Sequence, residues 1–342
     1  MTENNPSKLP PPMVLMRMFH GALIQRSICV VAKLGIADLL AEKPQTTAEL
    51  AARTKTHAPS LYRLLRALVS EGIFTENAEQ KFELTPISEW LRSDAPNSFH
   101  DYAVMLGEDW VWSAYKELMY SVQTGGVALE KVQGMRPFAF FEQNSEAGNI
   151  FNRAMTGLSL SVIPAIVAAY SFLGMSKLVD IAGGHGQLLS GVLKANPHLL
   201  GVLFDLPFVI AGAEELLKKE GVSDRIELAS GDFFESVPAG ADAYMMKQII
   251  HDWDDEQSVK ILQNIRSAMN ENAKVLIVEM VVPEGNMPSS SKTTDLQMLV
   301  IQGGKERTEE EYRKLLEASG FRLTRVIPTN SPLSIIEGER IF

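Results

Sequence analysis

The sequence predicts an α/β protein of two parts, a Rossmann-like domain preceded by an all-helical, winged-helix-like domain. From Lys177 onward, short apolar runs alternate with helical segments, which is typical of a parallel sheet with right-handed crossovers. Before that point, broad apolar stripes at helical spacing dominate. The length of 342 residues also exceeds what one hydrophobic core normally supports, so two domains are expected.

The composition is that of a globular protein, with 46% hydrophobic and 22% charged residues. The proline-rich N-terminus has no apolar segment of the kind found in secretory signals, so residues 1–12 are expected to be a flexible arm. The longest apolar stretch, 162–175, contains Pro164 and is too short to span a bilayer. The single cysteine, Cys29, fits a reducing compartment. We therefore expect a cytoplasmic protein without a membrane partner.

Residues 13–105 are expected to form the first domain. An apolar stripe between Met13 and Glu42 is broader than a surface helix needs, so we expect a core or a partner subunit to bury it. Its spacing is helical at Ile28, Val31, Leu34, Ala37 and Leu40. Thr46 and Glu49 match a capping box, and a second helix is expected from about Ser60 to the stop at Gly72. The segment IFTENAEQKFELT then predicts a small hairpin, which completes a winged helix.

A winged helix can bind DNA, but the charge of this segment argues against it. Residues 1–110 hold 11 Lys and Arg against 13 Asp and Glu, a net of −2, and the whole chain has a formal net charge of −10. Because phosphate binding needs clustered positive charge, we expect no nucleic-acid partner. A structural or dimerising role is favoured instead.

The second domain is expected over residues 106–342, with connecting helices over 106–175 and the sheet over 176–342. The run VDIAGGHGQL places Gly183, Gly184 and Gly186 between a strand and a helix. A glycine turn of this kind fits NAD, FAD or S-adenosylmethionine. Asp205 ends the next strand, 22 residues after Gly183, where a carboxylate can accept hydrogen bonds from ribose hydroxyls; the alternative is a helix N-cap.

A third strand ends at Asp232 and Phe233, where an acid and an aromatic ring could hold an adenine; Asp232 as an ordinary loop acid is the alternative. No basic residue lies near the glycine turn. Because S-adenosylmethionine carries no phosphate, this favours it over a dinucleotide as the cofactor.

His251 ends the apolar run of the fourth strand, at the same sheet edge as the glycine turn. Its ordinary pKa suits it to remove a proton from a hydroxyl near neutral pH, although a lone histidine is more often structural. Asp254 and Gln257 match a helix start, so the acid cluster that follows is interpreted as capping and no metal is expected. Glu279 lies within an apolar strand and needs a partner, for which an imidazole is suitable.

The segment DLQMLVIQGGKERTEEEY contains a tight Gly303–Gly304 loop, then Glu306, then a second capping box at Thr308. Three residues of this segment share one helix face and are candidates for contact with substrate. They are Asp295, Met298 and Gln302.

In combination these motifs resemble the plant-type and bacterial small-molecule O-methyltransferases, the caffeate/hydroxyindole O-methyltransferase family, over nearly the whole chain. The motifs that carry the resemblance are FNRAM at 151–155, VDIAGGHG, FDLP at 204–207, SGDFF, KQIIHDW and GGKERTEEEY. The resemblance implies a class I, S-adenosylmethionine-dependent enzyme of secondary metabolism that methylates an aromatic or polyketide-like hydroxyl. It also implies a homodimer joined through the N-terminal domain.

The resemblance assigns roles to named residues. His251 is the implied general base, flanked by Glu279 and Glu306. The cofactor would be bound by Asp180, Gly183, Gly184, Gly186, Asp205, Leu206, Gly231, Asp232, Phe233 and Lys247. The acceptor would be contacted by Met155, Leu158, Asp252, Asp295, Met298 and Gln302.

The chain departs from the family at three positions: Ala182 stands where glycine is frequent, His185 where threonine is common, and Leu158 where plant members tend to carry a histidine. The acceptor pocket is therefore not expected to be that of a lignin-pathway enzyme. Two alternatives stay open. One is a relative with N- or C-methylating or non-methylating chemistry at the same cofactor site, and the other is a ligand-sensing, DNA-binding regulator.

Overall fold

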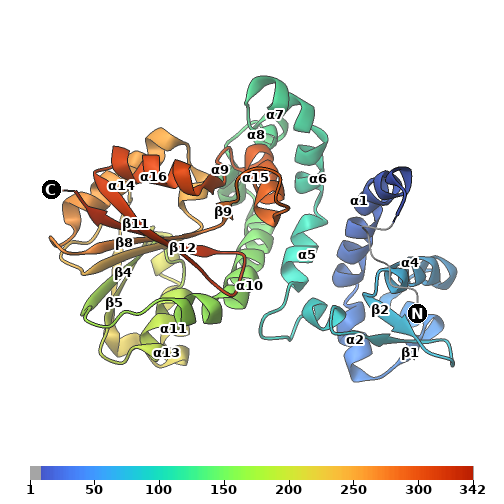
Figure 1. The fold of residues 1–342 in the computed structure, drawn as a ribbon. Coiled ribbons are helices and arrows are strands. Elements are labelled where there is room, and N and C mark those ends of the chain that lie inside the picture. Colours follow the sequence, from blue (N-terminus) through green and yellow to red (C-terminus); the bar gives the residue numbers. More distant parts are fainter. Residues whose placement is uncertain (1–8, 342) are drawn as a thin grey trace. The chain divides into compact units, whose positions relative to one another are not determined.

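The computed structural model describes residues 9–341, which form two compact units (Figure 1). The first unit comprises the chain up to Trp112 together with Phe141–Ser161, and the second comprises Ser113–Phe140 together with the chain from Val162 onward. The first unit thus includes 141–161, which the sequence analysis placed in the second domain. Residues 1–8 of the expected arm lie outside the described residues, and a helix already begins at Pro11.

The first unit has the expected winged-helix order of elements. Its α3 helix (Thr47–Thr54) begins with the predicted capping box, in which Thr46 and Glu49 bond each other's backbone N–H groups. The expected hairpin is β2 (Phe74–Glu76) and β3 (Lys81–Leu84), and β1 (Gln45–Thr46) adds a third strand to it in the order β1-β3-β2. The remaining helices up to Trp112 are α1 (Pro11–Lys33), α2 (Ile36–Glu42), α4 (Ala58–Ser70), η2 (Ser88–Leu91), α5 (His100–Leu106) and the start of α6 (Asp109–Lys116).

Helix α1 is apolar but mostly exposed. Its C-terminal part enters the core of the unit through Val31 and Ala32, whereas Met18, Phe19 and Leu23 are each at least 65% exposed. Helices α1 and α10 (Ser145–Ala169) are long and apolar enough to cross a membrane by length and composition alone, with mean hydropathies of 1.3 and 1.4. Apolar helices that pack against protein meet the same criteria, so this observation is weak evidence for a span.

The second unit is built on a seven-stranded sheet in the order β11-β12-β8-β7-β4-β5-β6. The strands β4 (Lys177–Ile181), β5 (Leu200–Asp205), β6 (Ile226–Ser230), β7 (Ala243–Lys247) and β8 (Lys274–Glu279) are parallel, as predicted. The antiparallel hairpin of β11 (Phe321–Pro328) and β12 (Ser334–Arg340), which was not predicted from the sequence, makes the sheet mixed. Because the strand order reverses between β4 and β7, the loops that follow these two strands flank the point where open sheets bind ligands.

Helices cover both faces of this sheet (Figure 1). On one face, α14 (Asp255–Ala268) and α16 (Glu309–Ala318) pack against alternate residues of the central strands, including Val179, Tyr244 and Ile277. On the other face lie α11 (Gln187–Ala195) and α13 (Ala213–Glu220), which pack on each other and, through α11, on β5. The other elements are α7 (Leu118–Thr124), α8 (Ala128–Gln133), α9 (Pro137–Gln143), α12 (Pro207–Ile210), η3 (Ser223–Arg225), η4 (Ile250–Asp252), β9 (Val281–Val282), α15 (Ser290–Ile301) and β10 (Arg307–Thr308).

A buried carboxylate joins the sheet to the end of α10. Glu337 on β12 accepts a hydrogen bond of 2.6 Å from the Tyr170 hydroxyl and one of 2.8 Å from Nη2 of Arg325, and it also bonds Thr324 and Lys274. Its side chain is only 2% exposed. Burial alone would raise the pKa of Glu337, but the bonds from Arg325, Tyr170 and Thr324 outweigh it and lower the pKa to about 2.

We predict that Glu337→Gln lowers the free energy of unfolding by roughly 2–3 kcal/mol, below the 3–5 kcal/mol of a fully buried pair because Arg325 is partly exposed. Since the folded pKa of Glu337 lies below its unfolded value, its contribution is present above about pH 4.5 and is lost as pH falls toward 2. Denaturant titrations of both proteins between pH 7 and 3 measure this difference.

Glu339→Gln is the matched control on the same strand, since Glu339 binds Lys274 and Arg322 from a 36% exposed position. This variant should lower the free energy of unfolding by less than about 1 kcal/mol. Equal losses in the two variants would contradict a special role for Glu337.

Candidate functional site

The glycine turn lies between β4 and α11, as predicted, and it is bonded to the end of β5. Oδ2 of Asp205 accepts a hydrogen bond of 2.8 Å from the Gly184 N–H, and its Oδ1 accepts one of 2.7 Å from the Leu206 N–H. A Cβ on Gly183 would lie 2.6 Å from Oδ2 of Asp180, so this position has room only for glycine. Gly184 and Gly186 have φ angles of +60° and +86°, and Ala182 also has a left-handed φ, of +53°. The last value explains why a glycine suits the position of Ala182.

A buried aspartate, Asp180, and a partly buried lysine, Lys247, lie at the ends of the neighbouring strands β4 and β7. Oδ2 of Asp180 has no hydrogen-bond partner among the described residues, and burial raises the pKa of Asp180 to about 7. The Lys247 ammonium donates to Oε1 of Gln248 over 3.0 Å, and burial lowers its pKa against the attraction of Glu279, Asp180 and Asp252. An unsatisfied buried carboxylate beside a glycine turn fits a cofactor that brings polar donors to this place.

The predicted adenine residues lie at the end of β6. Oδ1 of Asp232 accepts from the Phe234 N–H over 2.8 Å, which shapes the loop, and the Phe233 ring lies edge-on to Trp253. The Gly231 N–H donates to the Asp205 carbonyl over 3.1 Å, so the ends of β5 and β6 are joined. Leu206 is 42% exposed at the start of α12. The structure thus brings the predicted cofactor residues of the second unit to one edge of the sheet, and their roles stay predictions.

His251 lies on the η4 turn after β7, almost fully buried. Its Nδ1 is 2.8 Å from Oε1 of Glu306 and 3.5 Å from Oε2 of Glu279, and its Nε2 is 3.7 Å from Oδ1 of Asp252. Oε1 of Glu279 also accepts from the N–H groups of Ile249 and His251. With Nδ1 bonded to Glu306, Nε2 is the nitrogen left for an acceptor molecule.

The surrounding carboxylates change the ionisation of His251. Burial alone would lower its pKa, but Glu279, Asp252 and Glu306 outweigh burial and raise the pKa to about 10. Burial in turn raises the pKa of Glu279 to about 7 and that of Asp252 to about 6. The surrounding carboxylates therefore favour the protonated imidazole, unlike the environment of the ordinary histidine expected from the sequence.

The residues expected to contact the acceptor fall in both units. In the second unit, Asp295 accepts from the Glu306 N–H over 2.9 Å, and Met298 is buried on the same helix, α15. Gln302 caps α15, and its Oε1 is buried without a hydrogen-bond partner among the described residues. Met155 and Leu158 lie on α10 within the first unit, and their assignment to the acceptor stays a prediction.

Sequence reasoning missed Arg307, a fully buried arginine next to Glu306. Its guanidinium donates to the carbonyl oxygens of Ile250 and Trp253, which flank the His251 turn, and to the Asp255 carboxylate. The motif GGKERTEEEY contains this residue, but nothing in its spacing shows that an arginine among charged residues is buried.

His251, Glu279 and Glu306 also have the composition of a metal site, with one potential ligand atom from each within 4.8 Å of the others. A protonated His251 accounts for the cluster as well as a metal ion would, because an imidazolium also balances the carboxylates. The hydrogen bond between Nδ1 and Glu306 and the raised pKa of His251 agree with this interpretation.

Comparison with known proteins identifies the family. Residues 16–94 match the dimerisation domain of O-methyltransferases, and residues 115–322 match the O-methyltransferase domain. A phenazine O-methyltransferase (PhzM) from Lysobacter antibioticus is 44% identical over the full length of both chains. The crystal structure of LaPhzM has a TM-score of 0.91, covering 97% of this chain and 100% of that one.

More distant relatives agree with this assignment. A mitomycin biosynthesis 6-O-methyltransferase from Streptomyces lavendulae is 38% identical over 94% of this chain and 93% of its own. CalO1, a methyltransferase of calicheamicin biosynthesis solved with S-adenosylhomocysteine, is 33% identical with a TM-score of 0.88, covering 96% and 98% of the two chains. The chain therefore belongs to the O-methyltransferase family and is an S-adenosylmethionine-dependent O-methyltransferase.

Proposed function

We propose that this enzyme transfers a methyl group to the hydroxyl of an aromatic or polyketide-like small molecule of secondary metabolism, with His251 as general base. The observation that carries the proposal is the buried imidazole between Glu306 and Glu279, placed at the end of β7 beside the glycine turn that follows β4. Relatives that act on phenazine, mitomycin and 3-amino-4-hydroxybenzoate support this acceptor class.

The glycine turn and three strand ends would hold the cofactor, which supplies an activated methyl group on a sulfonium when bound. Asp205 would accept hydrogen bonds from the ribose, with its carboxylate already oriented by the Gly184 and Leu206 N–H groups. Asp232 and Phe233 would hold the adenine, and Asp180 and Lys247 would face the methionine portion.

His251 would remove the acceptor proton at Nε2, because Nδ1 is bonded to Glu306. The two glutamates fix the ring and stabilise the imidazolium that proton removal creates. Proton transfer of this kind contributes on the order of 10²–10⁴-fold to the rate, and alignment of the two reactants contributes about 7–11 kcal/mol. No step of this chemistry requires a metal ion, and we propose that the reaction is metal-independent.

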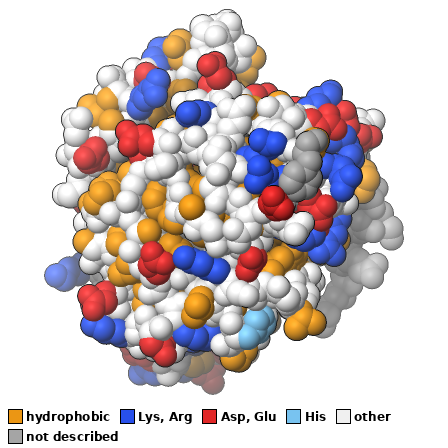
Figure 2. All heavy atoms as spheres, turned by 90° about the vertical axis from the view of Figure 1, so that its left-hand side faces the viewer, with side chains coloured by type: hydrophobic (Ala, Val, Ile, Leu, Met, Phe, Trp, Pro, Cys, Tyr) orange, Lys and Arg blue, Asp and Glu red, His pale blue; other side chains and the backbone are white. Residues whose placement is uncertain are grey.

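A relative that dimethylates the amine of 8-amino-8-demethylriboflavin is 36% identical, so an arylamine is the second acceptor class to assay. The DNA-binding alternative finds no support in charge, because residues 1–110 carry a net charge of −2. Figure 2 shows one face of the molecule, on which acidic and basic side chains are interspersed. We propose a cytoplasmic enzyme without nucleic-acid or membrane partners, with residues 13–105 as its dimerisation domain and 106–342 as its catalytic domain.

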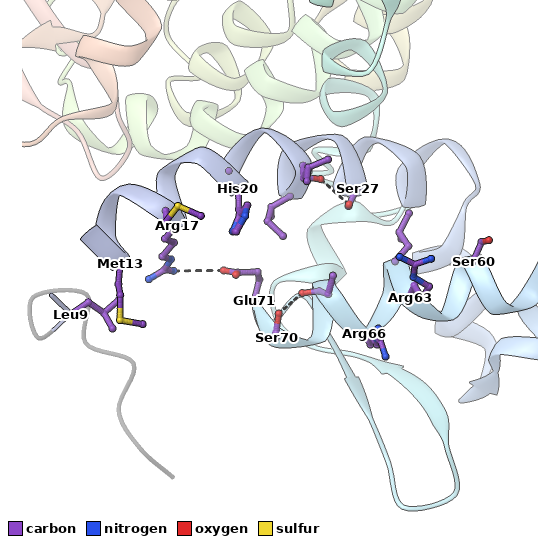
Figure 3. Close-up of a pocket in the computed structure, with 16 residues that line it drawn as sticks. Leu9, Met13, Arg17, His20, Ser27, Ser60, Arg63, Arg66, Ser70 and Glu71 are labelled. Atoms are coloured by element: carbon purple, nitrogen blue, oxygen red, sulfur yellow. Dashed lines mark hydrogen bonds and ion pairs between the residues drawn. The ribbon is translucent and has the colours of Figure 1, made fainter. Parts of the chain in front are cut away.

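We propose that the homodimer forms through the exposed face of α1. Together with α4 it lines a groove of about 1300 Å³ in which Met13, Met16 and Leu23 offer apolar contact (Figure 3). Arg17 pairs with Glu71 across this groove at 3.6 Å. Apolar side chains exposed at this density are typical of an obligate interface.

Replacing Asp205 tests the cofactor site. Asp205→Asn should weaken S-adenosylmethionine binding by roughly 10- to 100-fold, since hydrogen bonds to a charged group are worth about 1.5–3 kcal/mol. Calorimetry measures it, with Asp224→Asn, an exposed aspartate on η3, as control. Absence of saturable binding by the folded wild-type enzyme would contradict the proposed site.

The pH dependence tests the base. If His251 must lose its proton, kcat/KM of the wild-type enzyme rises about tenfold per pH unit between 7 and 9, because the pKa of the free histidine is about 10. Glu306→Gln removes a carboxylate that raises the pKa of His251, so its profile should level off at lower pH and at a lower maximum. His251→Asn should lower kcat/KM by about 10²–10⁴-fold, because the variant has no base at this position. Rates measured with EDTA present should be unchanged.

A profile in which wild type and Glu306→Gln level off at the same pH would exclude His251 as the titrating base.

Leu23→Glu should dissociate the dimer, because a charge would be buried in an apolar interface. We expect the dissociation constant of the dimer to rise at least about 100-fold. Sedimentation velocity measures the change. Met287→Glu, at a similarly exposed methionine of the second unit, is the control and should stay dimeric. A Leu23→Glu protein that sediments as wild type would place the interface elsewhere.

A further inference from the structure

The backbone of the His251 turn packs directly against the loop that carries Glu306. The Lys305 N–H donates to the His251 carbonyl oxygen over 2.9 Å. A Cβ on Gly304 would collide with that same oxygen, so the second glycine of the loop permits the contact. The position of His251 therefore depends on how this loop is held.

Arg307 holds the loop against the turn. Among the described residues it is the only buried arginine, and its side chain is fully buried. Nη1 donates to the Ile250 carbonyl and Nη2 to the Trp253 carbonyl, each over 3.0 Å, so the guanidinium bonds the residues on both sides of His251 and Asp252. Nη2 and Nε also bond Oδ1 of Asp255, at 2.8 and 3.1 Å, and Nη2 reaches Ser258 at 3.3 Å.

The backbone of Arg307 is fixed as well. In β10 it pairs with Val281 of β9, two residues beyond Glu279 on the chain. The next residue, Thr308, caps α16 through the second predicted capping box. One residue thus connects the segments that carry Glu279, Glu306 and His251.

We infer that Arg307 is a positioning residue that sets the placement of the His251 imidazole between Glu306 and Glu279. A buried ion pair is weak evidence for a stabilising role, because desolvation of the charges offsets their attraction. The hydrogen bonds from Arg307 to the two carbonyl groups instead fix the turn on which His251 lies. A misplacement of about 1 Å in a reacting group lowers the rate by about 10²-fold. This inference rests on the proposed role of His251 as the base.

Arg307→Lys is the decisive variant, because it keeps the positive charge but replaces the planar Nε, Nη1 and Nη2, which bond Asp255 and the two carbonyl groups, with a single nitrogen. The imidazole of His251 is titrated by NMR in histidine-labelled protein and assigned with His251→Asn. We expect the His251 titration to move down by at least about one pH unit and kcat to fall about 10²-fold, with the dissociation constant for S-adenosylmethionine within threefold of wild type.

Arg266→Lys is the matched control. Arg266 also donates to backbone carbonyls, those of Gly320 and Ile341, far along the chain from the histidine. It should leave both the titration and kcat unchanged.

If Arg307→Lys fails to fold, Asp255→Asn removes one of the partners of Arg307 from a side chain that is 61% exposed, and it should shift the titration in the same direction by a smaller amount. An unshifted His251 titration in the folded variants would overturn the inference, as would a loss of kcat no larger than the loss of folded protein. Because the titration needs no turnover, it decides this inference even if the wild-type enzyme methylates no acceptor.

Discussion

Burial of several charges in one place is the constraint on which the second unit depends. His251 lies among Glu279, Glu306 and Asp252, and none of these four side chains is more than 14% exposed. Isolated buried charges are costly, so the cluster is stable only if the imidazolium and the carboxylates stay close together. The raised pKa of His251 reflects this proximity, because the neighbouring carboxylates stabilise the protonated ring.

The parallel sheet provides that proximity. His251 follows β7 and Glu279 ends the adjacent strand β8, and the short β9–β10 pairing brings Glu306 to the same edge. The glycine turn follows β4, the other neighbour of β7. Two residues without glycine's freedom, Ala182 and Gln248, take left-handed backbone conformations at the ends of β4 and β7. Such conformations cost about 1–3 kcal/mol each and persist where surrounding contacts fix the chain, as at a ligand site.

The first unit supplies a different kind of surface. Its core is closed by α2, α3, α4 and the small sheet, yet most of α1 stays outside that core. The stripe at Ile28, Val31, Leu34, Ala37 and Leu40 enters the core of the unit, whereas Met18, Phe19 and Leu23 of α1 stay exposed. Residues 16–94, which include these exposed side chains, match a dimerisation domain. The acidic balance of residues 1–110 does not favour phosphate binding by this winged-helix order of elements.

Local patterns were sufficient for much of this protein. Residues close together in the sequence encode both capping boxes, the glycine turn, the five parallel strands and the acid at the tip of β5. These features can therefore be predicted without knowledge of the fold. The family motifs then pointed to His251, Glu279 and Glu306. The contacts of Arg307 and the pairing of β12 with β8 join distant segments, and no local spacing marks them. The strained backbone of Gln248 likewise has no signal in its neighbours. The ionisation of His251 was likewise decided by tertiary structure, since it depends on carboxylates 28 and 55 positions away that only the folded sheet brings to its ring.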